Sequence, residues 1–592
     1  MIFPVPMHEK YTDGIFKIAA DYTKYDMFSF WNTIKNGSDG ILFEYNRYLK
    51  KEEYKLIIDE SGVKIEYCTE EGKFRAATSL WQLIYLKGTQ LPFAEIRDYP
   101  QFERRGYMLD ICSGRMLTVE ATKKLIDVLA MTKYNELQLY MQNQYCYRYE
   151  AYPWCMEEGE TLNGDDIEEL DRYCKERFID LVPNQNSLGH LHEWFKEDKF
   201  RHLAVGDEEN MTNTVNFLMP EGEEFINNLY ESLLPHFSSE YVNIGLDEAS
   251  GLGRYQLKEY CDEVGYENAF MNYLNKLHNI TTKKYGKKTM FWDDLIINYP
   301  HSFNQIPEGS VALEWGYDMI QSQIMGERCR DLKEMGAEFY VVPGNCLWWT
   351  FTGRFDCMIF NVRTAAEVGQ KHGAKGYLMT DWGDSFINML YIPLALAAQY
   401  AWNVGRKQHG GWLKPEFVRY AEKFCDKFLY KADISIYLER MANYYLLEPA
   451  RIHNETMCYD VCKMELGQSA KGDIFDLNDY YDKEFYFDNI VDYMTKIRKD
   501  VEKIDFDETI KREVLINCDL TLFGANIAKI KSGNRDVNLI EHLIAEAQRL
   551  CDEHYDLWIK SFFKTGCERF ENELMKRKEE LSCLLKEIKD AK

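Results

Sequence analysis

The chain has 592 residues, of which 46% are hydrophobic and 15% aromatic, so it can bury a substantial core and lacks the composition of a disordered protein. Its length exceeds one ordinary core and predicts two or three domains once a large barrel is allowed. The formal net charge of −26 is opposite to the basic surface that phosphate binding requires, so no nucleic acid partner is expected.

The chain shows no targeting or membrane signal. Met1 to Lys10 contain neither a basic segment nor a long apolar one, so no signal peptide is expected. No apolar run approaches the ~20 residues that a membrane span needs, which predicts no membrane association. The 16 cysteines are scattered without CxxC pairs, which favours free thiols over a zinc module or a disulfide framework. These features predict a cytoplasmic protein.

Residues 1–98 mix short strand-like and helical segments. Tyr54–Asp59 and Val63–Tyr67 flank a short segment that ends in Gly62, a pattern typical of a hairpin with glycine in its turn. Phe74–Leu83 has the spacing of a helix. We predict a small α+β domain here, without a catalytic site of its own.

Residues 99–410 alternate strand-like and helix-length segments. The strand candidates are Gly106–Cys112, Glu136–Asn143, Phe178–Asn184, Tyr241–Asp247, Thr289–Asp293, Ser310–Trp315, Glu338–Pro343 and Gly376–Asp381. Eight such units predict a closed (β/α)₈ TIM barrel, and therefore an α/β fold class. A doubly wound open sheet is the rival, but it calls for a glycine-rich phosphate turn after its first strand, and the sequence has none.

The fourth strand candidate ends in two adjacent carboxylates, Asp247 and Glu248. Barrel enzymes present catalytic groups at the carboxyl ends of their strands, so these two residues are the expected reacting pair. Neighbours on a regular strand point to opposite faces, so both can enter one pocket only if the backbone bends there. The alternative is a surface Asp-Glu pair that opens a helix, since acids favour helix N-termini.

Tryptophans gather near the ends of other strand candidates. They are Trp292, Trp315, Trp348, Trp349 and Trp382. Indole faces pack on the C–H faces of a pyranose while carboxylates and amides bond its hydroxyls, so the pattern predicts a carbohydrate pocket. Core packing is the alternative for each tryptophan taken alone.

No metal and no cofactor are expected. His190 and His192 superficially resemble a metal-binding pair, but i and i+2 residues do not share a helix face. Asp293 and Asp294 could hold a cation, although carboxylates bonded to pocket hydroxyls are the preferred interpretation.

Residues 411–592 are predicted to be helical. Val537–Leu550 and Phe570–Lys589 are rich in Leu, Glu, Lys and Ala, with apolar residues three and four apart. No chemistry is expected in this region. We expect it to pack against the barrel or a second subunit, which would make a homodimer.

Four motifs follow one another along the barrel segment. They are Arg105-Gly106-Tyr107-Met108-Leu109-Asp110, Gly189-His190, Asn243-x-Gly245-x-Asp247-Glu248 and Trp382-x-Asp384. In this order they resemble glycoside hydrolase family 20, the β-N-acetylhexosaminidases, with Arg-Gly-x-x-x-Asp, Pro-Gly-His, His-x-Gly-Gly-Asp-Glu and Trp-x-Glu. The resemblance covers residues 1 to about 410. The segment Pro183-Asn184-Gln185-Asn186-Ser187 and the helical C-terminal region look closer to a bacterial, intracellular, exo-acting branch.

The resemblance implies a retaining exo-β-N-acetylhexosaminidase that releases terminal β-linked GlcNAc or GalNAc from an oligosaccharide or glycoconjugate by substrate-assisted catalysis. Glu248 would protonate the leaving oxygen and later deprotonate water. Asp247 would orient the sugar's own 2-acetamido group, whose carbonyl oxygen is the nucleophile. Two touching carboxylates push one pKa up, which would keep one proton available near neutral pH.

The resemblance also implies substrate-binding residues. These are Arg115, His190, Trp292, Trp315, Tyr340, Trp349, Trp382 and Asp384. Asp384 would bond the C4 and C6 hydroxyls, and Tyr340 the acetamido oxygen. The family's arginine lies three residues after the first-strand aspartate, where this chain has Ser113, so Arg115 is the nearest candidate.

Several positions depart from the family pattern. Gln142-Asn143-Gln144 replaces acidic residues, which would leave His190 without its carboxylate partner, and Asn243 and Leu246 replace signature residues. Two alternatives therefore stay open: a weakly active or inactive glycan-binding homologue, and a barrel glycosidase with a different sugar specificity.

Overall fold

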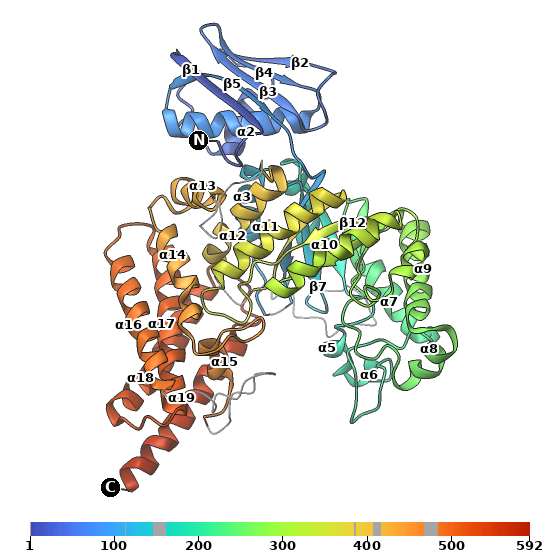
Figure 1. Cartoon of the computed structure of the whole chain (residues 1–592), viewed down its shortest axis with the longest axis vertical. Helices are drawn as coiled ribbons and strands as arrows, with labels where there is room; N and C mark the ends of the chain where they lie inside the picture. The colour runs from blue at the N-terminus through green and yellow to red at the C-terminus, as the bar shows by residue number, and fades with distance from the viewer. Residues whose placement is uncertain are drawn as a thin grey trace.

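The computed structural model describes residues 2–38, 40–112, 114–145, 161–383, 386–405, 416–466 and 483–591. Along its longest axis, an N-terminal sheet lies at one end, a barrel in the middle and a bundle of helices toward the other end (Figure 1).

The N-terminal part is a five-stranded sheet covered by helices. The elements are β1 (His8–Lys17), α1 (Met27–Ile34), β2 (Ile41–Tyr45), β3 (Tyr54–Asp59), β4 (Gly62–Tyr67), α2 (Glu70–Lys87) and β5 (Gln90–Asp98). The strand order is β1-β5-β3-β4-β2, with β2 and β4 parallel and the other pairs antiparallel. The predicted hairpin is confirmed as β3 and β4, and the predicted helix as part of α2.

The middle of the molecule is a closed barrel of eight parallel strands, as predicted, and the doubly wound alternative is wrong. The strands are β6 (Arg104–Asp110), β7 (Glu136–Met141), β8 (Asp180–Gln185), β9 (Tyr241–Asn243), β10 (Lys288–Trp292), β11 (Val311–Trp315), β12 (Glu338–Val342) and β13 (Gly376–Asp381). Each strand follows its predecessor around the barrel, and β13 closes it by pairing with β6 from Gly376↔Arg104 to Asp381↔Leu109.

Helices follow the barrel strands. They are α3 (Val119–Met131), α4 (Gly164–Lys175), α5 (His192–Phe195), α6 (Asp198–Arg201), α7 (Pro220–Leu233), α8 (Lys258–Val264), α9 (Tyr266–Tyr285), α10 (Met319–Glu334), α11 (Phe355–His372) and α12 (Tyr391–Trp402). The barrel interior is filled by side chains that include Met108, Val182 and Leu313, so it is a packed core rather than a pore.

The C-terminal region is helical, as predicted. Its helices are α13 (Glu416–Phe424), α14 (Ser435–Ala442), α15 (Met457–Lys463), α16 (Lys483–Glu502), α17 (Glu508–Lys531), α18 (Val537–Trp558) and α19 (Cys567–Asp590). This bundle lies on one side below the barrel, opposite the excursion that carries α5, α6 and α8 (Figure 1).

A buried aspartate joins the N-terminal sheet to the barrel. Asp98, the last residue of β5, is ion-paired with Lys133 at 2.8 Å, and both side chains are fully buried. It also accepts hydrogen bonds from Tyr54 of β3 and from the indole of Trp402 at the end of α12, both at 2.8 Å. Three elements distant in sequence therefore meet at one carboxylate.

Within the described ranges, no helix is both long and apolar enough to cross a membrane. The cysteines of those ranges are free thiols, most of them buried.

Candidate active site

The chain bends sharply where β9 ends, and this bend directs both predicted carboxylates toward one cavity. Regular strand geometry stops at Asn243, and Gly245, Leu246 and Glu248 then take positive φ values of 72°, 83° and 46°. Such angles are unfavourable for leucine and glutamate, so the surrounding packing must hold the turn in place. Asp247 and Glu248 consequently both line a cavity of about 390 Å³ at the barrel mouth.

A histidine lies between the two carboxylates. His190 Nε2 is 3.2 Å from Asp247 Oδ2 and 3.4 Å from Glu248 Oε2. The expectation that His190 has no carboxylate partner is wrong, because the reacting pair itself fills that role. The neutral Gln142 does line the cavity, and its side chain donates to the Tyr140 hydroxyl at 3.2 Å.

The charges of this cluster set where its proton resides. Burial lowers the pKa of His190, but the Asp247 and Glu248 carboxylates outweigh it and raise the pKa to about 10. The contact with His190 in turn holds the pKa of Glu248 below its usual value. The shared proton of the free protein is therefore on His190, and not on a carboxyl group as the sequence suggested.

A second group of acidic residues, which includes Asp294 after β10 and Glu314 of β11, lies next to the site. Asp294 Oδ2 accepts the backbone N–H of Glu248 at 3.0 Å, which helps to hold the strained turn. Burial and Asp247 raise the pKa of Asp294 to about 7. Burial likewise raises the pKa of Glu314, to about 8, despite Arg328 at 3.4 Å. The interpretation of Asp293 and Asp294 as hydroxyl-binding residues is wrong, because neither lines the cavity.

Aromatic rings form the walls of the cavity. Trp315 stacks on Tyr317 at a centroid distance of 4.9 Å, and Trp382 packs edge-on against Tyr140 at 4.7 Å. Trp292, Trp348 and Trp349 complete the wall, and Trp349 is 45% exposed at the rim.

Several buried polar atoms in the lining of the cavity, among them Asp247 Oδ1 and Trp292 Nε1, have no hydrogen-bond partner among the described residues. Because an unpaired buried polar atom is costly, such atoms commonly serve a ligand. Asp247 Oδ1 is thus available as an acceptor and Trp292 Nε1 as a donor in a pocket whose walls suit a sugar.

Three predicted site residues do not join this arrangement. Asp384 lies outside the described residues. The prediction that Tyr340 reaches the pocket is wrong: its side chain is fully buried within the barrel and its hydroxyl lies 3.4 Å from Glu136. Arg115 does not line the catalytic cavity either, since its guanidinium is buried behind Gly383 and ion-paired with Asp381 at 2.8 Å.

Sequence reasoning missed several lining residues. They are Tyr140, Gln321, Tyr317, His453, Asn454 and Arg569. Tyr317 could have been found, because it lies two residues beyond the end of β11, whereas Tyr340 lies in the middle of β12. Arg569 belongs to α19, a region in which no chemistry was expected.

Among the described residues, one group has the composition of a metal site. Ligand atoms of His554, Cys567 and Glu571 lie within 4.8 Å of one another. The Cys567 thiol donates to Glu571 Oε1 at 3.0 Å, which accounts for the arrangement by hydrogen bonding alone.

Family models match both the barrel segment and the N-terminal region of the chain. The model of the glycosyl hydrolase family 20 catalytic domain matches residues 102–345, and that of family 20 domain 2 matches residues 2–99. The chain is 27% identical over 285 residues to a beta-hexosaminidase of Porphyromonas gingivalis, a match that covers 42% of this chain and 36% of the relative. The chain spans about a third to a half of the length of the first such relatives.

Solved structures share the fold. A family 20 exo-β-N-acetylglucosaminidase of Vibrio harveyi, in complex with N-acetylglucosamine, aligns with a TM-score of 0.55 and 20% identity over 74% of this chain and 77% of its own. The Flavobacterium johnsoniae chitobiase aligns with a TM-score of 0.58 and 14% identity over 96% and 98% of the two chains. The two family models together match more than half of the 592 residues, and the chain belongs to glycosyl hydrolase family 20.

Proposed function

We propose that this protein is a retaining exo-β-N-acetylhexosaminidase that hydrolyses terminal β-linked GlcNAc or GalNAc residues of glycans. The observation that carries the proposal is the convergence of Asp247, Glu248 and His190 on one tryptophan-walled cavity. Family membership and the names of the relatives support it.

In the proposed reaction, Asp247, Glu248 and His190 share one proton, and Glu248 delivers it to the substrate. In the free protein the proton is on His190, which forms an ion pair with the carboxylates. When an uncharged sugar displaces water, the lower polarity disfavours separated charges, so the proton moves from His190 Nε2 to Glu248 Oε2. Glu248 then protonates the leaving oxygen and afterwards takes a proton from the attacking water.

Asp247 serves the other half of the reaction. Its Oδ2 is held by His190, and its Oδ1 has no partner in the described structure. That free oxygen is available to the N–H of the 2-acetamido group, which orients the carbonyl oxygen for attack on the anomeric carbon. The carboxylate also stabilises the positive charge of the oxazolinium-like intermediate, and two inversions at the anomeric carbon retain its configuration.

The decisive experiment compares leaving groups. Initial rates are measured for 4-nitrophenyl β-GlcNAc and β-GalNAc and for a β-GlcNAc-terminated disaccharide, with the wild type, Glu248→Gln and Asp247→Asn. We expect each variant to lose about 10²-fold or more on the disaccharide. Nitrophenolate departs with little protonation, so Glu248→Gln should lose much less on the aryl glycosides, whereas Asp247→Asn should lose about equally on all substrates.

The chain offers a matched control. Asp262 and Glu263 form another adjacent Asp-Glu pair, exposed on α8. Asp262→Asn and Glu263→Gln should leave every rate unchanged. If the wild type is inert on all three substrates but binds N-acetylhexosamines, the protein is a glycan-binding homologue and the proposal fails.

A further inference from the structure

The side chain of Asn243 holds the first peptide group of the turn that carries the two candidate acids. Asn243 is the last residue of β9, and its Oδ1 accepts the backbone N–H of Gly245 at 3.0 Å. A side-chain oxygen bonded to the N–H two residues further on is the geometry by which asparagine fixes a turn. The side chain is fully buried, so solvent does not compete for this bond. The contact therefore sets the direction in which the chain leaves the barrel before Asp247 and Glu248.

The backbone of the neighbouring strands holds only one side of this strand end. The Gly245 carbonyl accepts the backbone N–H of Trp292 at 3.0 Å, which ties the turn to β10. On the β8 side, strand pairing within the described ranges is confined to Asn184↔Asn243. The regular ladder to β8 ends there, and the Asn243 side chain supplies the partner of the Gly245 N–H instead.

A buried chain of hydrogen bonds fixes which way the Asn243 amide points. The Glu136 carboxylate, ion-paired with Arg104 at 2.6 Å, can only accept, and it accepts Gln138 Nε2 at 2.7 Å. Gln138 Oε1 must then face away from Glu136, and it accepts Asn243 Nδ2 at 3.2 Å. Because its Nδ2 is engaged in this way, Asn243 presents its Oδ1 to Gly245. Both amide orientations therefore follow from one carboxylate.

This chain of hydrogen bonds runs along the barrel from one end to the other. Arg104 is the first residue of β6 and Glu136 the first of β7, so their ion pair lies at the end of the barrel opposite the candidate site. Asn243 ends β9 at the mouth. Two amides thus connect the ion pair to the turn.

We propose that Asn243 is a positioning residue, which places Asp247 and Glu248 by holding the N–H of Gly245. It does not line the cavity, so it acts through the turn and not on a ligand. Asparagine suits this role because its amide is both a donor and an acceptor and stays uncharged at every pH. The consequence for catalysis rests on the proposed function, whereas the consequence for the position of the two acids does not.

The test uses the protonation of His190 as a reporter of where the two acids lie. Burial lowers the pKa of His190, but the Asp247 and Glu248 carboxylates raise it to about 10. NMR spectra of the full-length protein, isotopically labelled at histidine, are recorded against pH, and His190→Gln assigns the signal. Asn243→Leu is similar in shape but removes both hydrogen bonds, so the acids should move and the pKa of His190 should fall by about one unit or more. This reporter needs neither substrate nor turnover.

Asn184 offers a matched control. It is as buried as Asn243, lies beside it on β8, and donates its Nδ2 to the same Gln138 Oε1 at 3.1 Å. Its Oδ1 has no hydrogen-bond partner among the described residues, so it holds no part of the turn. Asn184→Leu should therefore leave the pKa of His190 unchanged. Thermal melting verifies that both leucine variants are folded.

Asn243→Asp provides a second test should Asn243→Leu not fold. The introduced carboxyl group has the donor and the acceptor of the amide when it is protonated, but no donor for Gln138 when it is ionised. Burial raises the pKa of such a group, so the neutral form prevails at low pH and is lost as the pH rises. The kcat/KM of this variant on 4-nitrophenyl β-GlcNAc, relative to the wild type, should fall about 10-fold or more between about pH 5 and about pH 9.

Asn184→Asp introduces the same charge beside Gln138 and should follow the wild type across this range. At alkaline pH, where both introduced carboxyl groups are ionised, the pKa of His190 should be lower in Asn243→Asp than in Asn184→Asp. This comparison again requires no activity.

The outcomes separate the inference from the proposed function. The inference is overturned if His190 keeps its wild-type pKa in a folded Asn243→Leu protein, or if Asn184→Leu lowers that pKa equally. A wild type that is inert on aryl glycosides overturns the proposed function, and the comparison of His190 between the variants still decides the inference. In an active enzyme, a fall in the pKa of His190 without any loss of kcat/KM would refute the consequence for catalysis.

Discussion

His190 controls the protonation of the candidate site, although the sequence offered it only a structural or substrate-binding role. Its raised pKa follows from two carboxylates within 3.4 Å, and the lowered pKa of Glu248 is the counterpart of the same contact. A motif comparison shows that a histidine precedes the acid pair in the chain, but it cannot show which carboxylate the ring will face.

A pH profile tests this arrangement. The wild type holds its proton on a group whose pKa is about 10, so kcat/KM should stay high at neutral pH and fall about tenfold per pH unit above that value. In His190→Gln the proton must be held by a carboxyl group of ordinary acidity, so the alkaline limb should move to lower pH by several units. The measurement is kcat/KM against pH for both proteins. An alkaline limb at the same pH in both would show that His190 does not carry the proton.

Tyr340 and Tyr317 show how far residue-level prediction reaches. The resemblance suggested Tyr340, the tyrosine of β12, as the residue that bonds the acetamido oxygen. Its position in the middle of that strand directs it to the barrel interior, while Tyr317, beyond the end of β11, lines the cavity. Positional reasoning about strand ends would have separated the two, and resemblance alone did not.

At the scale of elements, the strands were predictable and the turn after β9 was predictable in part. All eight barrel strands overlap their predicted segments because continuous apolar runs between helical segments are typical of parallel strands. The need for a bend at Asp247 and Glu248 followed from strand alternation and is confirmed. The supports of the bend, such as Asp294 beneath Glu248, depend on tertiary contacts that local patterns do not encode.

Gly245 allows the chain to form this turn, and its replacement should lower kcat/KM. Its φ is +72°, and a Cβ there would lie 2.0 Å from Asn186 Oδ1 and 2.9 Å from the Asn186 Cα. Gly245→Ala should therefore displace Asp247 and Glu248 and lower kcat/KM by about 10²-fold, as small misplacements in active sites do. Gly309→Ala is the control, because Gly309 has a similar φ of +80° but nothing within 4 Å. It should cost about 1 kcal/mol of folding free energy and no activity. Equal losses of activity would refute the role assigned to Gly245.

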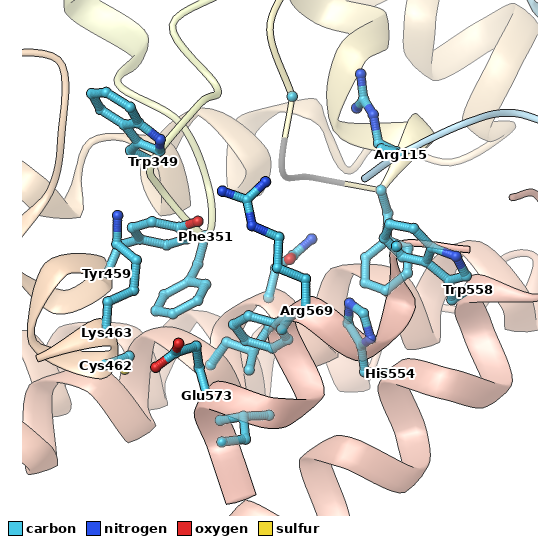
Figure 2. Close-up of a pocket in the computed structure, with 17 residues that line it drawn as sticks. Arg115, Trp349, Phe351, Tyr459, Cys462, Lys463, His554, Trp558, Arg569 and Glu573 are labelled. Atoms are coloured by element: carbon cyan, nitrogen blue, oxygen red, sulfur yellow. The ribbon is translucent and has the colours of Figure 1, made fainter. Parts of the chain in front are cut away.

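At the scale of the whole molecule, contacts between distant segments explain what the sequence could not show. Arg569 reaches the barrel mouth from α19, more than 180 residues after the last barrel strand. It also lines a neighbouring cavity of about 190 Å³, in which it lies between Trp349 and Arg115 (Figure 2). No pattern within α19 distinguishes this arginine from those of a solvated helix face. The helical region was predictable as structure, but its contribution to two cavities required the folded chain.

The Asp98–Lys133 pair gives a stability prediction at this scale. Lys133→Met would leave the fully buried Asp98 carboxylate without its cation, which should lower the free energy of unfolding by about 3–5 kcal/mol. Lys175→Met removes an ion pair in which the lysine is 58% exposed, and it should cost no more than about 1 kcal/mol. Chemical denaturation of both variants measures the difference. Similar costs for the two would mean that Asp98 is held adequately by Tyr54 and Trp402.

Barrel closure has a consequence for biosynthesis. Because β6 pairs with β13, the first barrel strand to be synthesised waits for the last barrel strand, with Gly376 opposite Arg104. At ordinary elongation rates this interval is on the order of tens of seconds. Throughout it the nascent chain carries an unpaired strand edge that is prone to aggregation. The topology therefore places completion of the barrel late in synthesis, after Gly376–Asp381 has left the ribosome.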